Sequence, residues 1–121
     1  MMKKLITHAS EGVKVPDICG LAIELVNEEI SNSTNMSLAL IIIDSNASSQ
    51  QHYHLKTEEI YYILDGEALI EIGGQATRVG KDHSIFIPVG KIHKITNIGK
   101  EPLRFISVDS PIFDQDDVFI S

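Results

Sequence analysis

The sequence has few of the features on which cross-linked and membrane-spanning proteins depend. Cys19 is the only cysteine among 121 residues, so no disulfide can form within the chain, as is usual in the reducing cytoplasm. The longest aliphatic run, residues 38–43, is far shorter than the roughly 20 apolar residues that cross a bilayer. No long apolar run follows Lys3 and Lys4, which excludes a secretory signal of the usual form. We therefore expect a cytoplasmic protein without a membrane anchor.

Positive charge is also scarce. The chain has 10 lysine and arginine residues against 17 aspartate and glutamate residues, for a formal net charge of −7, and the basic residues are scattered. An acidic surface repels the phosphate backbone of nucleic acids, so we expect no nucleic-acid partner. Much of the acid lies at Asp114, Asp116 and Asp117, which predicts a solvated surface tail from about residue 110.

Tryptophan is absent and aromatic residues are few, so aliphatic residues, isoleucine above all, must fill the core. Isoleucine is β-branched and packs well on a pleated sheet. Segments that suit strands recur at intervals of roughly eight to twelve residues, which is typical of sandwiches and barrels, and Asp65-Gly66 is a hairpin signal. The expected strands are 37–44, 51–55, 58–64, 67–72, 75–79, 84–87, 91–96 and 103–108. No linker divides them, so we predict one all-β domain over residues 1–121.

The region before residue 36 gives a weaker pattern. We expect a short edge strand over residues 3–7, a loop with a turn over residues 11–20, and another loop over residues 31–35. Residues 21–30 fit a helix or a strand, and the pattern does not decide between them.

His52-Tyr53-His54 is the most informative pattern for chemistry. Side chains in a strand alternate between faces, so the two imidazoles project from the same face. Together they form a natural pincer for a metal such as Zn, Fe, Ni or Cu. The tripeptide by itself fits two exposed surface histidines equally well.

Two glutamates, Glu58 and Glu59, follow this pair. In a continuous strand Glu58 lies roughly 13 Å beyond His54, which is too far for both to bind one ion. A bend over residues 55–57 must therefore intervene if either glutamate is a ligand. A bend resets the alternation of faces, so the residues alone do not choose between the two.

Two longer motifs that contain these residues resemble those of the cupin superfamily. The first cupin motif is G-x5-H-x-H-x3–4-E-x6-G, and residues 46–66 match it at His52, His54, Glu59 and Gly66. The second is G-x5-P-x-G-x2-H-x3-N, and residues 82–97 match it at Pro88, Gly90, His93 and Asn97.

The resemblance implies a cupin double-stranded β-helix, which is a jelly-roll-like barrel. It implies that His52, His54, Glu59 and His93 hold one divalent metal ion, which is Fe, Mn, Ni, Zn or Cu. The motif spacing before Gly66 selects Glu59 over Glu58. Small cupins commonly pair through edge strands, so the resemblance also implies a homodimer.

The leading glycine of each motif is replaced, by Asn46 in the first and by Asp82 in the second. Asn and Asp are the non-glycine residues that best tolerate a left-handed backbone. We therefore expect both substitutions to conserve the conformation. The alternative is that Gly80 takes the second role, with two extra residues in the loop.

Tyr61 and Arg104 are candidates for roles beyond metal binding. By alternation Tyr61 shares the face of Glu59, so its hydroxyl is a candidate catalytic and substrate-orienting group; the alternative is a core aromatic. Arg104 is a candidate for binding an anionic substrate; the alternative is a solvated strand residue.

Three functions remain. We favour a metal-dependent enzyme that acts on a small polar metabolite, as a dioxygenase or as an isomerase of the sugar-phosphate type, because the resemblance covers both. A non-catalytic module that binds a small ligand or a metal is the alternative. The third function, a structural cupin, is disfavoured by the complete set of ligands.

Overall fold

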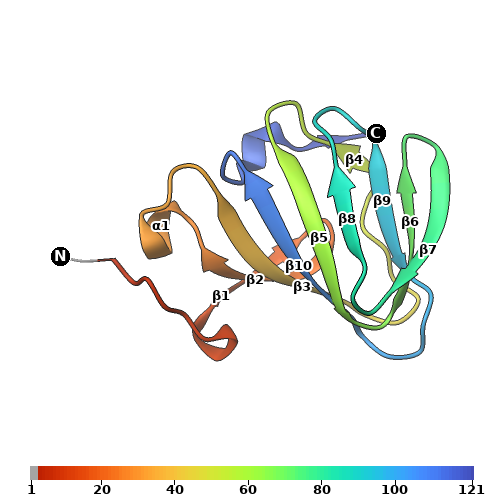
Figure 1. Cartoon of the computed structure of the whole chain (residues 1–121), viewed down its shortest axis with the longest axis horizontal. Helices are drawn as coiled ribbons and strands as arrows, with labels where there is room; N and C mark the ends of the chain where they lie inside the picture. Colours follow the sequence, from red (N-terminus) through yellow and green to blue (C-terminus); the bar gives the residue numbers. More distant parts are fainter. Residues whose placement is uncertain (1–2) are drawn as a thin grey trace.

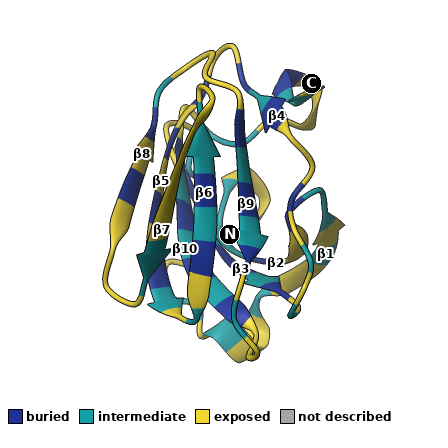
Figure 2. Ribbon diagram, turned by 90° about the vertical axis from the view of Figure 1, so that its right-hand side faces the viewer, coloured by how far each residue is buried: buried dark blue, intermediate teal, exposed yellow. Residues whose placement is uncertain are grey.

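Alternating burial along the longer strands shows how this sequence builds a sheet with one face in the core. Buried residues recur at every second position through most of β5 (Glu58–Asp65) and β10 (Leu103–Ser110). Tyr61, Ile63 and Phe105 each expose 1% or less of their surface. Figure 2 shows this alternation as bands of buried and exposed residues along the strands.

The computed structural model describes residues 3–121, and its strands form two antiparallel sheets (Figure 1). The first sheet has the order β1 (Val13–Asp17), β2 (Gly20–Val26), β3 (Ser37–Ile43), β10, β5 and β8 (Ser84–Ile87). The second has the order β11 (Phe119–Ile120), β4 (His52–Tyr53), β9 (His93–Asn97), β6 (Glu67–Ile72) and β7 (Gln75–Gly80). The prediction of an all-β fold is confirmed.

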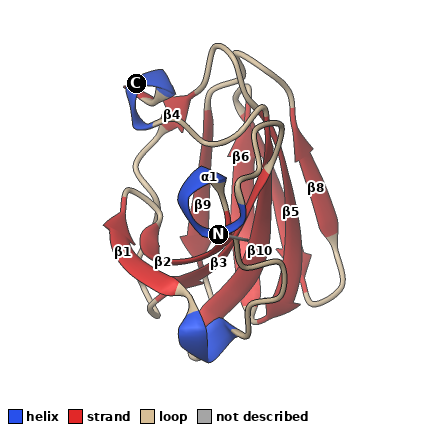
Figure 3. Ribbon diagram, turned by 90° about the vertical axis from the view of Figure 1, so that its left-hand side faces the viewer, coloured by secondary structure: helices blue, strands red, loops and turns tan. Residues whose placement is uncertain are grey.

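Short helical segments lie at the margins of the sheets (Figure 3). They are η1 (Ala9–Glu11), α1 (Glu28–Ser31) and η2 (Gln115–Asp117). Within residues 3–121, no helix has the length and apolar character needed to span a bilayer.

The core is built mainly of isoleucine, as the shortage of aromatic residues requires. Full burial of one such side chain contributes about 1.5–3 kcal/mol. The core isoleucines are Ile41, Ile43, Ile63, Ile70, Ile85, Ile87 and Ile95.

The leading position of each sequence motif has a left-handed backbone. Asn46 has a φ of 66° and Asp82 has a φ of 69°. This is the conformation for which glycine is usually chosen, and the expectation of a conservative replacement is confirmed. Gly80 lies in β7 and is not among the residues with positive φ, so the alternative that assigned it this role is wrong.

The region before β3 differs from the prediction. Residues 13–17, expected as a loop, form β1 and pair with β2 along their whole length. Pro16 is tolerated because β1 is an edge strand, where a missing N–H costs no ladder hydrogen bond. Residues 3–7 form no strand, and residues 21–30 contain both alternatives, most of β2 followed by α1.

The C-terminal segment is not simply a solvated tail. Its strand β11 pairs with β4, and the rings of Tyr53 and Phe119 stack with their centroids 5.3 Å apart. Asp114 and Asp116 are exposed as expected. The expectation is wrong for Asp117, which is only 3% exposed, and the reason lies at the site described next.

Candidate metal centre

Four side chains, three on strands and one directly after β4, converge on a single point. His52 lies on β4, His54 directly follows it, Glu59 lies on β5 and His93 on β9. One potential ligand atom from each lies within 4.8 Å of those from the others, and all four residues are buried. The structure thus brings together the set that the two motifs named, in a geometry that could hold a metal ion.

Each histidine is held by a main-chain carbonyl, which fixes its ring orientation. A carbonyl oxygen only accepts, so each Nδ1 must carry the proton and donate it, and Nε2 then keeps a lone pair. The three bonds run from His52 Nδ1 to the Gln50 oxygen at 2.7 Å, from His54 Nδ1 to the Asp117 oxygen at 3.0 Å, and from His93 Nδ1 to the Lys91 oxygen at 2.9 Å. Such bonds are the usual support of histidine ligands in metal sites.

Three buried atoms at the centre lack a hydrogen bond. They are His54 Nε2, His93 Nε2 and Glu59 Oε1. The carboxylate oxygen lies 3.1 Å from the first nitrogen and 3.2 Å from the second. With both Nδ1 atoms protonated, all three atoms are electron-pair donors facing one another, and buried unpaired acceptors are costly. A cation among them removes this cost, so the donor set fits a divalent metal.

The histidines respond differently to protons in the metal-free protein. Burial and the neighbouring His93 lower the pKa of His52 to about 4. Burial also lowers the pKa of His54, but a protonated Nε2 can donate to Glu59; this hydrogen bond and the charge of Glu59 outweigh burial, and the net pKa is raised. Burial opposes the charge on Glu59, but the hydrogen bonds that the neighbouring imidazoles of His54 and His93 can donate hold the pKa of this carboxyl well below its usual value. A proton at His54 therefore substitutes in part for a metal.

The bend required between His54 and the glutamates is present, and Asp117 stabilises it. Its carboxylate accepts the main-chain N–H groups of Leu55 at 3.0 Å, Lys56 at 3.0 Å and Thr57 at 3.2 Å. The same residue holds His54 through its main-chain oxygen. No local pattern in the sequence could identify this role, because the partners lie about 60 residues earlier in the chain.

Beyond the bend, alternation decides which glutamate faces inward. Glu58 is exposed, whereas Glu59 is 5% exposed and Tyr61 is 1% exposed. Tyr61 therefore shares the face of Glu59 as predicted, and its ring centroid lies 6.4 Å from that of His93. Arg104 is not brought to this site, because it forms a surface ion pair with Asp65.

Two residues of β10 that sequence reasoning missed lie beside Glu59. Ser107 Oγ donates to Glu59 Oε2 at 3.4 Å, and Asp109 is the partner of Glu59 in the β5–β10 pairing. Burial, with the hydrogen bond and charge of Glu59, raises the pKa of Asp109 to about 10, so Asp109 is uncharged at neutral pH. The available signal was parity, because both residues share the buried face of Phe105.

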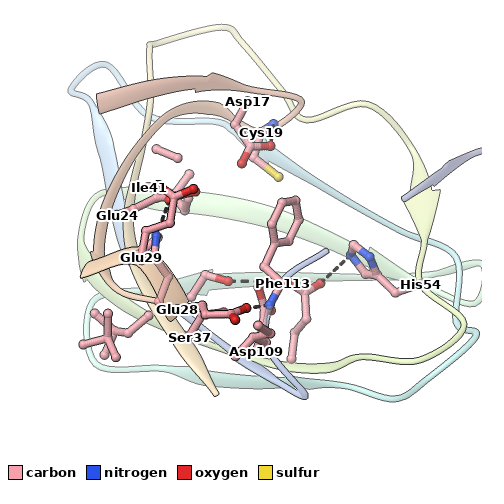
Figure 4. Close-up of a pocket in the computed structure, with 18 of the residues that line it drawn as sticks. Asp17, Cys19, Glu24, Glu28, Glu29, Ser37, Ile41, His54, Asp109 and Phe113 are labelled. Carbon is pink, nitrogen blue, oxygen red and sulfur yellow. Dashed lines mark hydrogen bonds and ion pairs between the residues drawn. The ribbon is translucent and has the colours of Figure 1, made fainter. Parts of the chain in front are cut away.

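Three of the four converging residues, His52, His54 and Glu59, line one end of a cavity of about 600 Å³. Its walls at this end include His52, His54, Glu59 and Tyr61, and it continues between β2, β3 and the C-terminal segment (Figure 4). A volume of this size is typical of sites for small organic ligands.

Comparisons with known proteins identify relatives of this chain. The family model described as Cupin domain matches residues 39–109. The uncharacterized protein MJ1618 of Methanocaldococcus jannaschii is 35% identical over 97 residues, which are 80% of this chain and 78% of that protein.

Solved structures share the fold over nearly the whole chain. A protein from Planctomyces limnophilus matches with a TM-score of 0.81 and 30% identity, over 98% of this chain and 97% of that one. A protein from Klebsiella pneumoniae described as having a double-stranded beta-helix domain matches with a TM-score of 0.74 and 19% identity, over 90% and 91% of the two chains. The expected double-stranded β-helix is confirmed.

Proposed function

The chain belongs to the cupin domain family, and we propose that it is a metal-dependent enzyme acting on a small polar metabolite. One divalent ion, Fe, Mn, Ni, Zn or Cu, is held by His52, His54, Glu59 and His93. The reaction is of the dioxygenase or isomerase type.

The observation that carries this proposal is the group of unpaired buried acceptors at the end of the cavity. Structural metal sites are closed, whereas catalytic sites keep a position open to substrate. Here three acceptor atoms lack hydrogen bonds, and two of the residues that carry them, His54 and Glu59, border a volume that a small molecule can enter. Both features are expected of a centre that meets a substrate.

The ion supplies Lewis-acid or redox chemistry when it is bound. The remaining steps depend on residues of the chain. Glu59 provides the only negative charge of the ligand set, which leaves a divalent centre with a net charge of +1. Tyr61 lines the cavity beside this carboxylate. Burial raises the pKa of Tyr61 well above its usual value, so its hydroxyl stays protonated and orients a substrate oxygen or nitrogen by hydrogen bonding.

We propose that the protein works as a cytoplasmic homodimer. The edge strand β8 and its neighbour β5 expose Ile60, Tyr62 and Phe86, which are 46%, 41% and 54% exposed. An unpaired edge beside exposed apolar side chains is suited to pairing with a second copy. Light scattering on the purified protein tests this, and a monomer at micromolar concentration contradicts it.

Elemental analysis of the purified protein tests the metal centre. We expect about one equivalent of transition metal in the wild type and less than a tenth in His54→Ala. His83→Ala is the matched control, because His83 is an exposed histidine outside the site, and it should retain the metal. Less than a tenth of an equivalent in the wild type, even after reconstitution, contradicts the proposal.

Turnover separates the enzyme from the non-catalytic alternative. The protein is loaded with Fe(II) or Mn(II) and assayed for oxygen uptake and for isomerisation against a panel of small metabolites. Turnover that is lost in His54→Ala and kept in His83→Ala supports an enzyme. Ligand binding without turnover under every metal favours a binding module.

A further inference from the structure

The cavity that reaches the metal centre has a charge that restricts what it can bind. Beyond Glu59 and Asp109, it is lined by Asp17, Glu24, Glu28 and Glu29. Lys3 is the only lysine or arginine among its lining residues within the described chain. Lys3 is exposed, and its Nζ donates to the main-chain oxygen of Glu29 at 2.8 Å. The walls are therefore strongly negative.

These carboxylates are not neutralised by other parts of the protein. Between residues 3 and 121, no lysine or arginine nitrogen forms an ion pair with Asp17, Glu24, Glu28 or Glu29. Glu24 accepts only the amide of Asn27, at 2.7 Å. Asp17 and Glu24 are half-buried, so their charges are less screened than those of a solvated surface.

Asp109 provides an independent sign of a missing ligand. It is 7% exposed, lines the cavity, and its Oδ1 has no hydrogen-bond partner. It is the cross-strand partner of Glu59. A polar atom buried without a partner is costly, and a ligand that carries hydrogen-bond donors can pair with it.

Part of the remaining wall is apolar. Its side chains, from β2, β3 and the C-terminal segment, are Ala22, Val26, Leu38, Ala39, Ile41, Ile112 and Phe113. Figure 4 shows the acidic side chains of Glu24, Glu28 and Glu29 on the far side of Phe113 from His54. A ligand that fills the space thus meets the metal centre at one end, an apolar surface in the middle and negative charge at the other end.

We propose that the cavity binds an organic cation, an amine or guanidinium carried on a short apolar skeleton, with the positive group among Glu24, Glu28 and Glu29. This rests on the proposed function, because the other end of the ligand is placed at the metal centre. An anionic substrate such as a sugar phosphate finds no arginine here, since the candidate clamp Arg104 is paired elsewhere with Asp65.

Three probes of matched size test the charge preference: 2-phenylethylamine, 3-phenylpropionate and 2-phenylethanol. Their affinities for the zinc-loaded protein are measured by calorimetry at pH 7.5. A carboxylate binds a metal ion more readily than a protonated amine does, so the metal alone favours the propionate. We expect the amine to bind at least tenfold more tightly than the propionate. The ratio of the two affinities should decrease at high salt, which screens the charges of the cavity.

Charge-removing variants locate the effect. Glu24→Gln and Glu28→Gln should each weaken amine binding about three- to tenfold and leave alcohol binding unchanged. Glu67→Gln is the control, because Glu67 is an exposed glutamate of the other sheet and does not line the cavity. The use of two cavity positions guards against a folding defect in one of them.

The outcomes separate this inference from the proposed function. Propionate binding as tight as that of the amine, or no amine binding at all, overturns the inference. If this occurs in protein with full zinc occupancy, the metal centre still stands. If zinc occupancy fails while the amine preference persists and falls in Glu24→Gln, the charge of the cavity is supported and the metal-dependent function is contradicted.

Discussion

Replacing Asp117 should weaken both the fold and the metal centre, although this residue is not a ligand. Asp117→Ala removes an acceptor of three main-chain N–H groups. The change also loosens the segment whose main-chain oxygen holds His54. We therefore expect the bend after His54 to lose its support.

The magnitude follows from the exposure of the three donors. The Thr57 N–H is buried, and leaving it unpaired costs about 1–3 kcal/mol. Leu55 and Lys56 are exposed, so water replaces the carboxylate there and each lost bond costs only about 0.5–1 kcal/mol. The sum is a loss of about 3 kcal/mol in the free energy of unfolding. Loss of such supporting bonds typically lowers metal affinity 10- to 100-fold.

Urea unfolding of the metal-free protein and zinc competition with a chromogenic chelator measure the two effects separately. Asp116→Asn is the matched control, because Asp116 is exposed and adjacent, and it should change both quantities little. The stability and the zinc affinity of Asp117→Asn should lie between those of the alanine variant and the wild type. The amide keeps one acceptor oxygen, but its NH₂ group is a donor that faces main-chain N–H donors. Unchanged stability and unchanged zinc affinity in Asp117→Ala would refute the reasoning.

Three further outcomes are expected. Asn46→Gly should leave stability within about 0.5 kcal/mol of the wild type, whereas Asn46→Val should cost about 1–2 kcal/mol by denaturant titration, because a β-branched residue resists the φ of 66°. Zinc affinity should fall as the pH drops, beginning above the ordinary histidine value of about 6.5, because the pKa of His54 is raised once Glu59 outweighs burial. Competition with a chelator over a pH series measures this, and an affinity that stays constant down to pH 6 would contradict it. Ile63→Ala should cost about 2–5 kcal/mol of stability, since Ile63 is 0% exposed, and a cost below 1 kcal/mol would contradict the placement of the core.

Local patterns predicted the part of the fold whose contacts are local. The strand β6 has the predicted limits, residues 67–72, and Gly66 has the positive φ of 98° that a hairpin turn requires. Turn chemistry and alternation act over a few residues, so both can be seen in sequence. The replacement of the motif glycine by Asn46 was interpretable for the same reason.

Contacts between distant segments could not be predicted in this way. Pro16 suggested a loop, but tertiary pairing with β2 made its segment an edge strand. The acidic run containing Asp117 suggested solvent, but one carboxylate of the run found three donors about 60 residues away. The choice of Glu59 required the motif spacing, because no local property distinguishes it from Glu58 before the bend is known.

The contact of Asp117 with His54 also sets an order of events during synthesis. A ribosome-bound chain that has exposed only residues 1–110 already contains all four converging side chains, yet it lacks the carbonyl that orients His54 and the carboxylate that shapes the bend. The strand that pairs with β4 is missing as well. The ligand set of the nascent chain should therefore bind metal more weakly until residue 117 and the strand after it have emerged.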